Sequence, residues 1–328
     1  GSEMCIRDRA CPMPKSPRST LFASLLLAVS TTLPCGEVYS SDMVGDNLFD
    51  LSLEQLLSLE VSGASRKSQT VAETAAAAFV ISANDIERSG AASIPEALRM
   101  VPGIHVGQID GNTYAVTARG SNDRYASKML VMIDGRTVYT PSYSGVYWDI
   151  HEIPMTDIER IEVIRGPGSA LWGVNAVNGV INVVTRHADD AQGGLAVVSA
   201  GDQLNHEVSL RWGGTFGDPA AYRVYLQSKD RVGIQDTVGN AIDDTAEQLR
   251  VGGRIDWQLN NTDTVMLTAD AYDIVSGATF NILSLGVSVG LVRNDGETTS
   301  EGYSSLGRWS RTRANGSETA IQAYIDSM

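Results

Sequence analysis

The sequence predicts a small α+β domain followed by antiparallel β-strands, in a protein that is exported from the cytoplasm. Three observations lead to this fold class: an apolar export segment near the N-terminus, a middle region that mixes helix and strand signals, and a C-terminal region of alternating apolar and polar residues. The 328 residues are enough for about two domains. Glycine is abundant, at 32 residues, and this favours turn-rich β structure over a helical bundle.

Charge and cysteine content exclude several classes of protein. A formal net charge of −14 argues against a nucleic-acid partner, because phosphates require a basic face. The three cysteines all lie within the first 35 residues, so removal of that segment leaves no disulfide scaffold and no cysteine-based metal site or nucleophile. The four histidines lack metal-ligand spacing, and neither a nucleophile elbow nor a phosphate-binding loop is present. We therefore expect no cofactor, no metal and no enzyme activity.

The N-terminal region has the pattern of a secretory signal peptide over residues 13–40. It starts at Met13, carries two positive charges, and continues into the apolar run Leu21–Val29, which is too short to span a membrane as a helix. Cleavage is expected near Ser40, and a lipoprotein site at Cys35 is disfavoured by the proline before it. Residues 1–12 are expected to be an artefact of a fragmentary reading frame. No apolar run elsewhere in the chain reaches the length of about 18 residues that a membrane-spanning helix needs.

The rest of the chain divides into a linker (41–74), a mixed domain (75–186) and a strand-rich region (187–328). In the mixed domain, Asn84 or Asp85 is expected to cap a helix that ends at Gly90, and Ser93 to cap a second helix that ends at Pro102-Gly103. Ile158–Ile164 alternates apolar and charged residues and is expected to be half-buried. The other expected strands are Ala78–Ser82, Ile104–Val106, Tyr114–Arg119, Met129–Ile133 and Gly179–Thr185.

The strand-rich region shows alternation with a period of two. In Leu249–Leu259, for example, Val251 and Trp257 share one face, and Arg250 and Arg254 share the other. Segments of about ten residues with one apolar and one polar face are typical of transmembrane β-strands. A soluble sandwich with one solvated face gives the same pattern, so the strands alone leave both alternatives open. Export favours the membrane barrel.

Residues 77–186 resemble the plug domain of TonB-dependent outer-membrane receptors. The most specific stretch is Ile158–Arg186 (IERIEVIRGPGSALWGVNAVNGVINVVTR), where an alternating strand is followed by Arg-Gly-Pro, an aromatic-Gly pair and Asn-Gly-Val-Ile-Asn. Ser89–Gly103, Ala118–Gly120 and Val131–Arg136 match further plug segments in the same order. The resemblance implies a plug followed by the first strands of a barrel that has 22 strands in complete members, so we expect residues 187–328 to be an incomplete barrel.

The resemblance also implies which residues are functional. Its extended TonB box, which would add as a strand to TonB, falls on Leu59, Glu60, Val61, Ser62 and Gly63. Two plug arginines, Arg119 and Arg165, are expected to pair with barrel carboxylates that lie beyond Met328. The apical loops that touch substrate correspond to Gln108, Asp110, Asn112, Tyr114, Tyr139, Tyr143, Tyr147 and Trp148. The aromatic side chains suit an amphipathic ligand, and packing between plug and wall is an equal alternative for them.

The implied function is active import of a scarce nutrient, such as a ferric siderophore, cobalamin or haem, across the bacterial outer membrane. The expected partners are TonB, outer-membrane lipid and a small-molecule or metal-chelate substrate, with the receptor acting as a monomer. The alternatives are a passive porin or adhesin and a non-functional truncated receptor. A signalling receptor is disfavoured because only about twenty residues separate Ser40 from Glu60, too few for an extra periplasmic domain.

Overall fold

The computed structural model describes residues 60–61, 69–70, 77–120, 122–140, 142–143, 145–166, 175–234, 242, 244–285 and 289–328. The side chains of 278–285 and 289–295 are not described. The predicted signal peptide, residues 1–12 and most of the predicted linker lie outside the described residues. No helix within these ranges is both long and apolar enough to cross a membrane.

The α+β domain is built on one mixed sheet with the strand order β3-β8-β9-β6-β7. β6 and β9 run parallel, and the other neighbours in the sheet run antiparallel. A separate hairpin is formed by β4 and β5. The strands are β3 (Ala77–Ser82), β4 (Ile104–Gln108), β5 (Tyr114–Ala118), β6 (Met129–Ile133), β7 (Arg136–Thr137), β8 (Ile158–Arg165) and β9 (Gly179–Thr185). Two short 3-10 helices, η2 (Met155–Asp157) and η3 (Asp189–Ala191), precede β8 and follow β9.

Two short helices connect β3 to β4, and local hydrogen bonds explain where each begins. α3 (Ala83–Ser89) starts at Ser82, which forms a capping box with Asp85, and it ends at Gly90 in the left-handed conformation. The expected cap at Asn84 or Asp85 is therefore wrong by two or three residues, because Ser82 accepts the capping hydrogen bond first. α4 (Ile94–Leu98) starts at Ser93 as predicted, but it ends before the predicted Pro102-Gly103.

The core of the domain lies on both faces of the mixed sheet. Alternate residues of β6 enter two apolar clusters: Val131 lies in the larger one with the helices and β8, and Leu130 lies in the smaller one. β8 is covered on both faces, which corrects the half-buried expectation for Ile158–Ile164. Its Glu162 is fully buried and accepts hydrogen bonds from Arg160 at 2.9 Å and Asn182 at 3.2 Å, and these bonds compensate the lost hydration.

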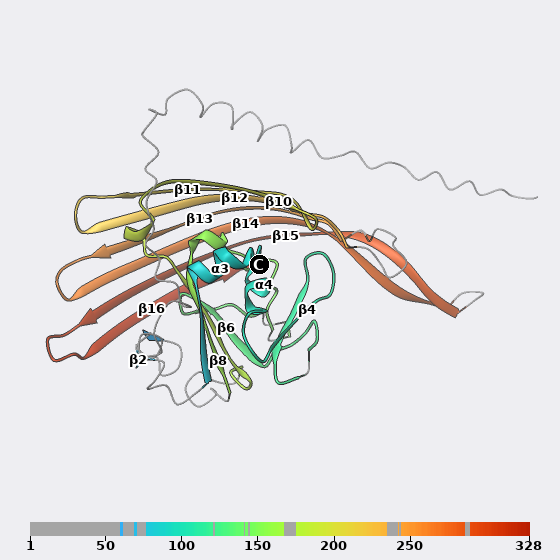
Figure 1. The fold of residues 1–328 in the computed structure, drawn as a ribbon, viewed down its shortest axis with the longest axis horizontal. Coiled ribbons are helices and arrows are strands. Elements are labelled where there is room, and N and C mark those ends of the chain that lie inside the picture. Colours follow the sequence, from blue (N-terminus) through green and yellow to red (C-terminus); the bar gives the residue numbers. More distant parts are fainter. Residues whose placement is uncertain are drawn as a thin grey trace, which may run out of the picture. The chain divides into compact units, whose positions relative to one another are not determined.

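The strand-rich region forms one antiparallel sheet of seven consecutive strands, which we call the strand wall. Figure 1 shows these strands side by side in one curved sheet. Tight turns, each closed by a backbone hydrogen bond, join β11 to β12, β13 to β14 and β15 to β16. The strands are β10 (Gly193–Gly201), β11 (Leu204–Thr215), β12 (Ala220–Arg231), β13 (Ala246–Gln258), β14 (Asp263–Leu285), β15 (Val289–Thr312) and β16 (Glu318–Ser327).

The strand wall buries its polar face and exposes its apolar face. Arg250 is 2% exposed, whereas its neighbour Val251 is 53% exposed. A soluble sandwich has the opposite arrangement, so the burial pattern decides between the two alternatives left open by periodicity, in favour of the membrane-barrel type. Aromatic side chains gather near the tight turns on the apolar face, as in the girdle of a transmembrane barrel: Trp212, Phe216, Tyr222, Trp257 and Trp309.

Candidate functional site

Buried ion pairs join the α+β domain to the polar face of the strand wall. Glu152, in the segment between β7 and β8, accepts a hydrogen bond from Lys229 at 2.7 Å and one from Arg231 at 2.8 Å. All three side chains are at most 7% exposed. Burial alone would raise the pKa of Glu152, but the positive charges of Lys229 and Arg231 outweigh it and hold that pKa below its ordinary value. Glu152 is therefore ionised at neutral pH.

A second ion-pair cluster lies where the α+β domain continues into β8. Asp157 is fully buried and pairs with Arg211 at 2.9 Å and with Arg223. Its backbone oxygen accepts from the amide of Arg186, so the carboxylate is held firmly. Glu152 and Asp157 therefore each meet two cations of the wall, which satisfies several of their acceptor positions at once.

We call the polar contacts between the domain and the wall the seam. Arginines extend this seam along the sheet. Arg136 of β7 pairs with Asp326 of β16 and lies 4.0 Å from Asp270 of β14. In the opposite direction, arginines of the wall donate to backbone oxygens of the domain: Arg250 to Ile150, Arg254 to Thr185 and Arg308 to Asp134. The contact between domain and wall thus uses mainly polar groups of both partners, with one small apolar cluster in which Ile150 meets Tyr272 and Ile274.

The two predicted plug arginines do not take part in these pairs. Arg165 donates to the backbone oxygen of Pro102 at 2.6 Å, and Arg119 lies in the left-handed region with φ 62°. Neither forms an ion pair with a carboxylate of the described residues. Their pairing with later barrel strands stays a prediction. Sequence reasoning missed the carboxylates Glu152 and Asp157, because their partners lie more than 50 residues away along the chain.

Two of the predicted substrate-contacting residues are buried within the protein. Tyr114 is 4% exposed, and its hydroxyl donates to Glu96 at 2.9 Å while accepting from Arg231 at 3.2 Å. Trp148 is 7% exposed and belongs to the main apolar core of the domain. These contacts agree with the alternative of packing inside the protein, and contact of Tyr114 and Trp148 with substrate stays a prediction.

The remaining aromatic side chains form a cluster on the same loops. Tyr143 contacts Tyr125 and Tyr147 edge to face, with ring centroids 5.1 and 5.2 Å apart. Tyr125, which sequence reasoning missed, is exposed, and so is Tyr139. Tyr147 also packs against a small apolar cluster that includes Tyr272 of the wall. Edge-to-face aromatic surfaces with polar tips suit an amphipathic ligand. Their contact with substrate stays a prediction.

Three other predicted residues lie at the contact between the domain and the wall. Asn112 is buried beside Glu152 and Lys229. Asp110 accepts hydrogen bonds from the amides of Asn112 at 3.1 Å and Thr113 at 2.6 Å and so closes its own turn. Gln108 lies at the end of β4 and lines a cavity. The structure therefore brings these residues close to the ion-pair seam.

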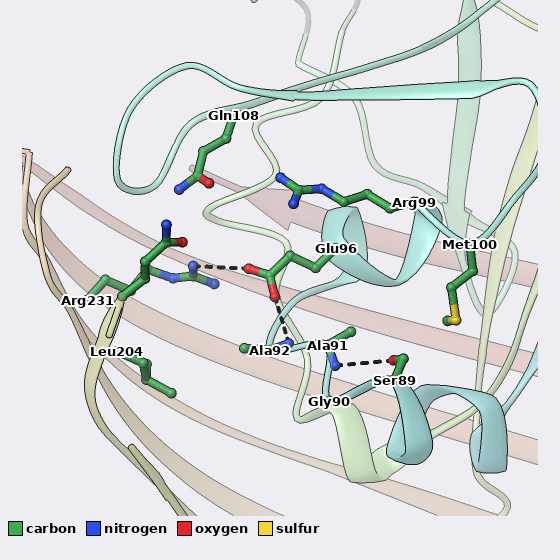
Figure 2. A pocket seen from close by; sticks show the side chains of 11 residues that line it. Ser89, Gly90, Ala91, Ala92, Glu96, Arg99, Met100, Gln108, Leu204 and Arg231 are labelled. Carbon is green, nitrogen blue, oxygen red and sulfur yellow. Dashed lines mark hydrogen bonds and ion pairs between the residues drawn. The ribbon is translucent and has the colours of Figure 1, made fainter. Parts of the chain in front are cut away.

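That cavity has a volume of about 380 Å³ and lies between α3, α4, β4 and the outer ends of β11 and β12. Figure 2 shows Glu96, Arg99 and Gln108 on one side and Arg231 and Leu204 on the other. Glu96 is already engaged, because it accepts from the amide of Ala92 at 2.9 Å and lies 3.7 Å from Arg231. The cavity is large enough for a small ligand.

A smaller cavity of about 50 Å³ lies inside the seam. His151 lines it, and the Nε2 atom of His151 is buried without a hydrogen-bond partner in the described part of the chain. Burial, together with the positive charges of Arg136 and Arg250, lowers the pKa of His151 to about 3. The imidazole is therefore neutral at physiological pH, and the cavity has room for a few water molecules that could satisfy it.

The predicted TonB box is described at two of its five residues. Glu60 and Val61 form β1, which pairs antiparallel with β2 (Gln69–Thr70). Leu59, Ser62 and Gly63 lie outside the described residues.

In the Arg-Gly-Pro motif, Gly166 has φ 125°, a conformation that favours glycine, and residues 167–174 lie outside the described ranges.

Comparison with known proteins identifies the α+β domain. The family model described as "TonB-dependent Receptor Plug Domain" matches residues 70–180. A vitamin B12 transporter, BtuB, of Vibrio vulnificus is 31% identical over 242 residues, which are 73% of this chain and 35% of that protein. The transporter of the same name from Vibrio cholerae serotype O1 is 30% identical over 172 residues, which are 52% of this chain and 27% of that protein. The chain thus spans about a third of the length of these curated relatives.

Solved structures share the fold at low sequence identity. The ferripyoverdine receptor from the outer membrane of Pseudomonas aeruginosa has a TM-score of 0.60 and 17% identity, over 80% of this chain and 35% of that one. The copper transporter OprC has a TM-score of 0.56 and 16% identity, over 76% of this chain and 36% of that one. In both, about two thirds of the neighbour's chain lies outside the matched part.

Proposed function

Because the chain belongs to the TonB-dependent outer-membrane receptors, with a plug domain followed by part of the barrel sheet, we propose that its receptor imports a scarce nutrient across the bacterial outer membrane. The main support for this proposal is the strand wall, whose polar face is buried and whose apolar face is exposed. A sheet that is apolar outside and polar inside suits lipid on one face and a hydrated plug on the other. The relatives that match are transporters and receptors, which supports transport rather than catalysis.

We propose cobalamin as the first substrate to test. Both curated relatives are vitamin B12 transporters, while the structural neighbours bind or carry other cargo. The predicted apical loops combine the exposed Tyr139 and the partly exposed Tyr143 and Tyr147 with the partly exposed carboxylate of Asp110. Such a surface suits a neutral amphipathic molecule better than a polyanionic iron chelate, because like charges repel.

We propose that TonB binds residues 59–63 and supplies the energy for transport. An extended segment can add as a strand to a partner's sheet, mainly through backbone hydrogen bonds. In the described residues Glu60 and Val61 already pair with Gln69 and Thr70, which supports an extended conformation for this segment. We further propose that the receptor acts as a monomer whose apolar outer face contacts membrane lipid.

The experiment is uptake of radiolabelled cyanocobalamin by cells that express the receptor from its complete gene and lack their own cobalamin transporter. We expect saturable uptake that disappears when TonB is deleted. Uptake that persists without TonB would indicate a passive porin. If cyanocobalamin is not taken up but a ferric siderophore is, in a TonB-dependent manner, the receptor assignment stands and the substrate assignment falls.

A further inference from the structure

Asp244 lies at the contact between the outer rim of the strand wall and the plug. It precedes β13 by two residues and is 1% exposed. One oxygen of its carboxylate, Oδ2, accepts from the amide of Gly111 in the plug at 2.6 Å. The other, Oδ1, accepts from the amide of Ile234, on the opposite arm of the β12–β13 loop, at 2.9 Å. One buried side chain therefore joins three segments of the chain.

The two arms of the β12–β13 loop close around Asp244 and form what we call the loop neck, residues 232–234, 242 and 244. The amide of Ile242 donates to the oxygen of Ile234 at 3.0 Å, which ties the arms together. The oxygen of Thr245 accepts from Gly277 at 2.8 Å, which ties the neck to β14. Asp244 is therefore held by the wall itself, and any opening of the neck must move its carboxylate.

The plug side of the contact is shaped to fit. The apical turn, residues 110–113, is closed by Asp110, so the amide of Gly111 remains to point outward to Asp244. A Cβ atom at position 111 would overlap the backbone oxygen of Asp244. The approach is thus so close that only glycine fits without a shift. Immediately after the turn, the hydroxyl of Tyr114 contacts Arg231 at the end of β12, which gives the hairpin a second fixed point.

We propose that Asp244 is a positioning residue that couples the neck of the β12–β13 loop to the apical turn of the plug. A ligand that moves the loop neck must displace the carboxylate from Ile234, from Gly111 or from both. The turn leads into β5 and Tyr114, which reach the ion pair between Arg231 and Glu152. A change at the loop neck therefore has a route to the ion pairs that hold the plug, through the hydrogen bond to Gly111, the backbone of the turn and the contact between Tyr114 and Arg231.

The test measures amide hydrogen exchange in the purified full-length receptor without substrate. Asp244→Ala removes both acceptors, and Asp244→Asn leaves one acceptor in place of two. We expect the exchange of Gly111 to be at least about tenfold faster in the alanine variant, as for loss of a hydrogen bond to a charged group. The matched control is Glu247→Gln, which neutralises an exposed carboxylate three residues further along.

Coupling also requires the reciprocal effect, since linkage between two sites works in both directions. Gly111→Ala lies in the plug, yet it should speed exchange of the amides of Ile234 and Ile242 in the loop neck. If each variant changes exchange only in its own segment, or if Asp244→Ala behaves like Glu247→Gln, the proposal is overturned. These measurements are independent of the substrate.

A second arm uses cyanocobalamin as the probe and rests on the proposed function. In the native receptor, we expect the ligand to change exchange in residues 108–118, and we expect Asp244→Ala to abolish that change while ligand still binds. A ligand-induced change that survives in the alanine variant would refute the coupling role. If the native receptor does not bind cyanocobalamin at all, the substrate assignment fails, and the reciprocal test alone decides on Asp244.

Discussion

Replacing Glu152 by glutamine should loosen the plug inside the barrel. The substitution keeps the size of the side chain but removes the charge that pairs with both Lys229 and Arg231. Breaking a buried ion pair by removing one partner costs about 3–5 kcal/mol, because the remaining charge is left uncompensated. Two other carboxylates, Glu207 at 3.8 Å and Glu96 at 3.7 Å, partly compensate the two cations. We therefore expect the low end of that range, about 3 kcal/mol.

The assay is hydrogen exchange of amides in the central plug strand β9 of the full-length receptor, where exchange requires the plug to open. A loss of about 3 kcal/mol corresponds to exchange on the order of 100-fold faster. The control is Glu159→Gln, because Glu159 is 44% exposed and its pair with Arg160 is screened by solvent.

Two further measurements separate the charge effect from a packing defect. Arg231→Gln in the Glu152→Gln background should restore part of the protection, since it removes one uncompensated cation. The difference between native receptor and Glu152→Gln should also shrink as the pH falls. The folded pKa of Glu152 lies below its ordinary 4.5, so its contribution is complete above that value and is lost on further acidification. Equal exchange in Glu152→Gln and Glu159→Gln would refute the reasoning.

Three further predictions concern other parts of the chain. The folded pKa of His151 is about 3, below the ordinary 6.5, so plug stability should be full above pH 6.5 and should fall between pH 6.5 and 3, by up to about 1.4 kcal/mol per pH unit. In His151→Gln, the rate of amide exchange in the plug should depend less on pH. Val251→Arg places a charge on the lipid face, at a cost of about 2–4 kcal/mol, and should reduce the amount of assembled receptor seen in heat-modifiability gels. Glu247→Arg, near the edge of the apolar band, should leave that amount unchanged. Gly179→Ala should destabilise the plug in the same exchange assay, because its Cβ would overlap the backbone oxygen of Ile164 in the neighbouring strand.

Local sequence signals were sufficient where one segment decides its own structure. Met129–Ile133 and Gly179–Thr185 are continuous apolar runs in the centre of a sheet, and both strands have the predicted bounds. The start of the first helix was misplaced because Ser82, Asn84 and Asp85 are all good capping residues, and the reciprocal capping box between Ser82 and Asp85 makes Ser82 the cap. Alternation also predicted which residues of β13 share a face.

The sequence could not reveal which face of that strand is buried or what the buried charges contact. Periodicity is the same for a solvated polar face and a polar face covered by another domain. Likewise, the contact of Asp157 with Arg223 joins residues 66 positions apart and depends on how the wall packs against the plug. Asp244 shows no local signal at all, since its partner Gly111 lies 133 residues away.

The chemistry of the seam follows from what the plug has to do in the proposed transport cycle. A plug held by apolar packing would expose that surface to water whenever it moved, at about 25 cal/mol for each Å². Ion pairs and hydrogen bonds can instead be exchanged for contacts with water, so their net contribution is small compared with their gross strength. The plug keeps most of its buried apolar residues in its own core, where Val131 and Ile181 pack together, and it meets the wall mainly through Glu152, Asp157 and Arg136. Such an interface holds the plug in one position at rest and still allows it to be displaced without unfolding the wall.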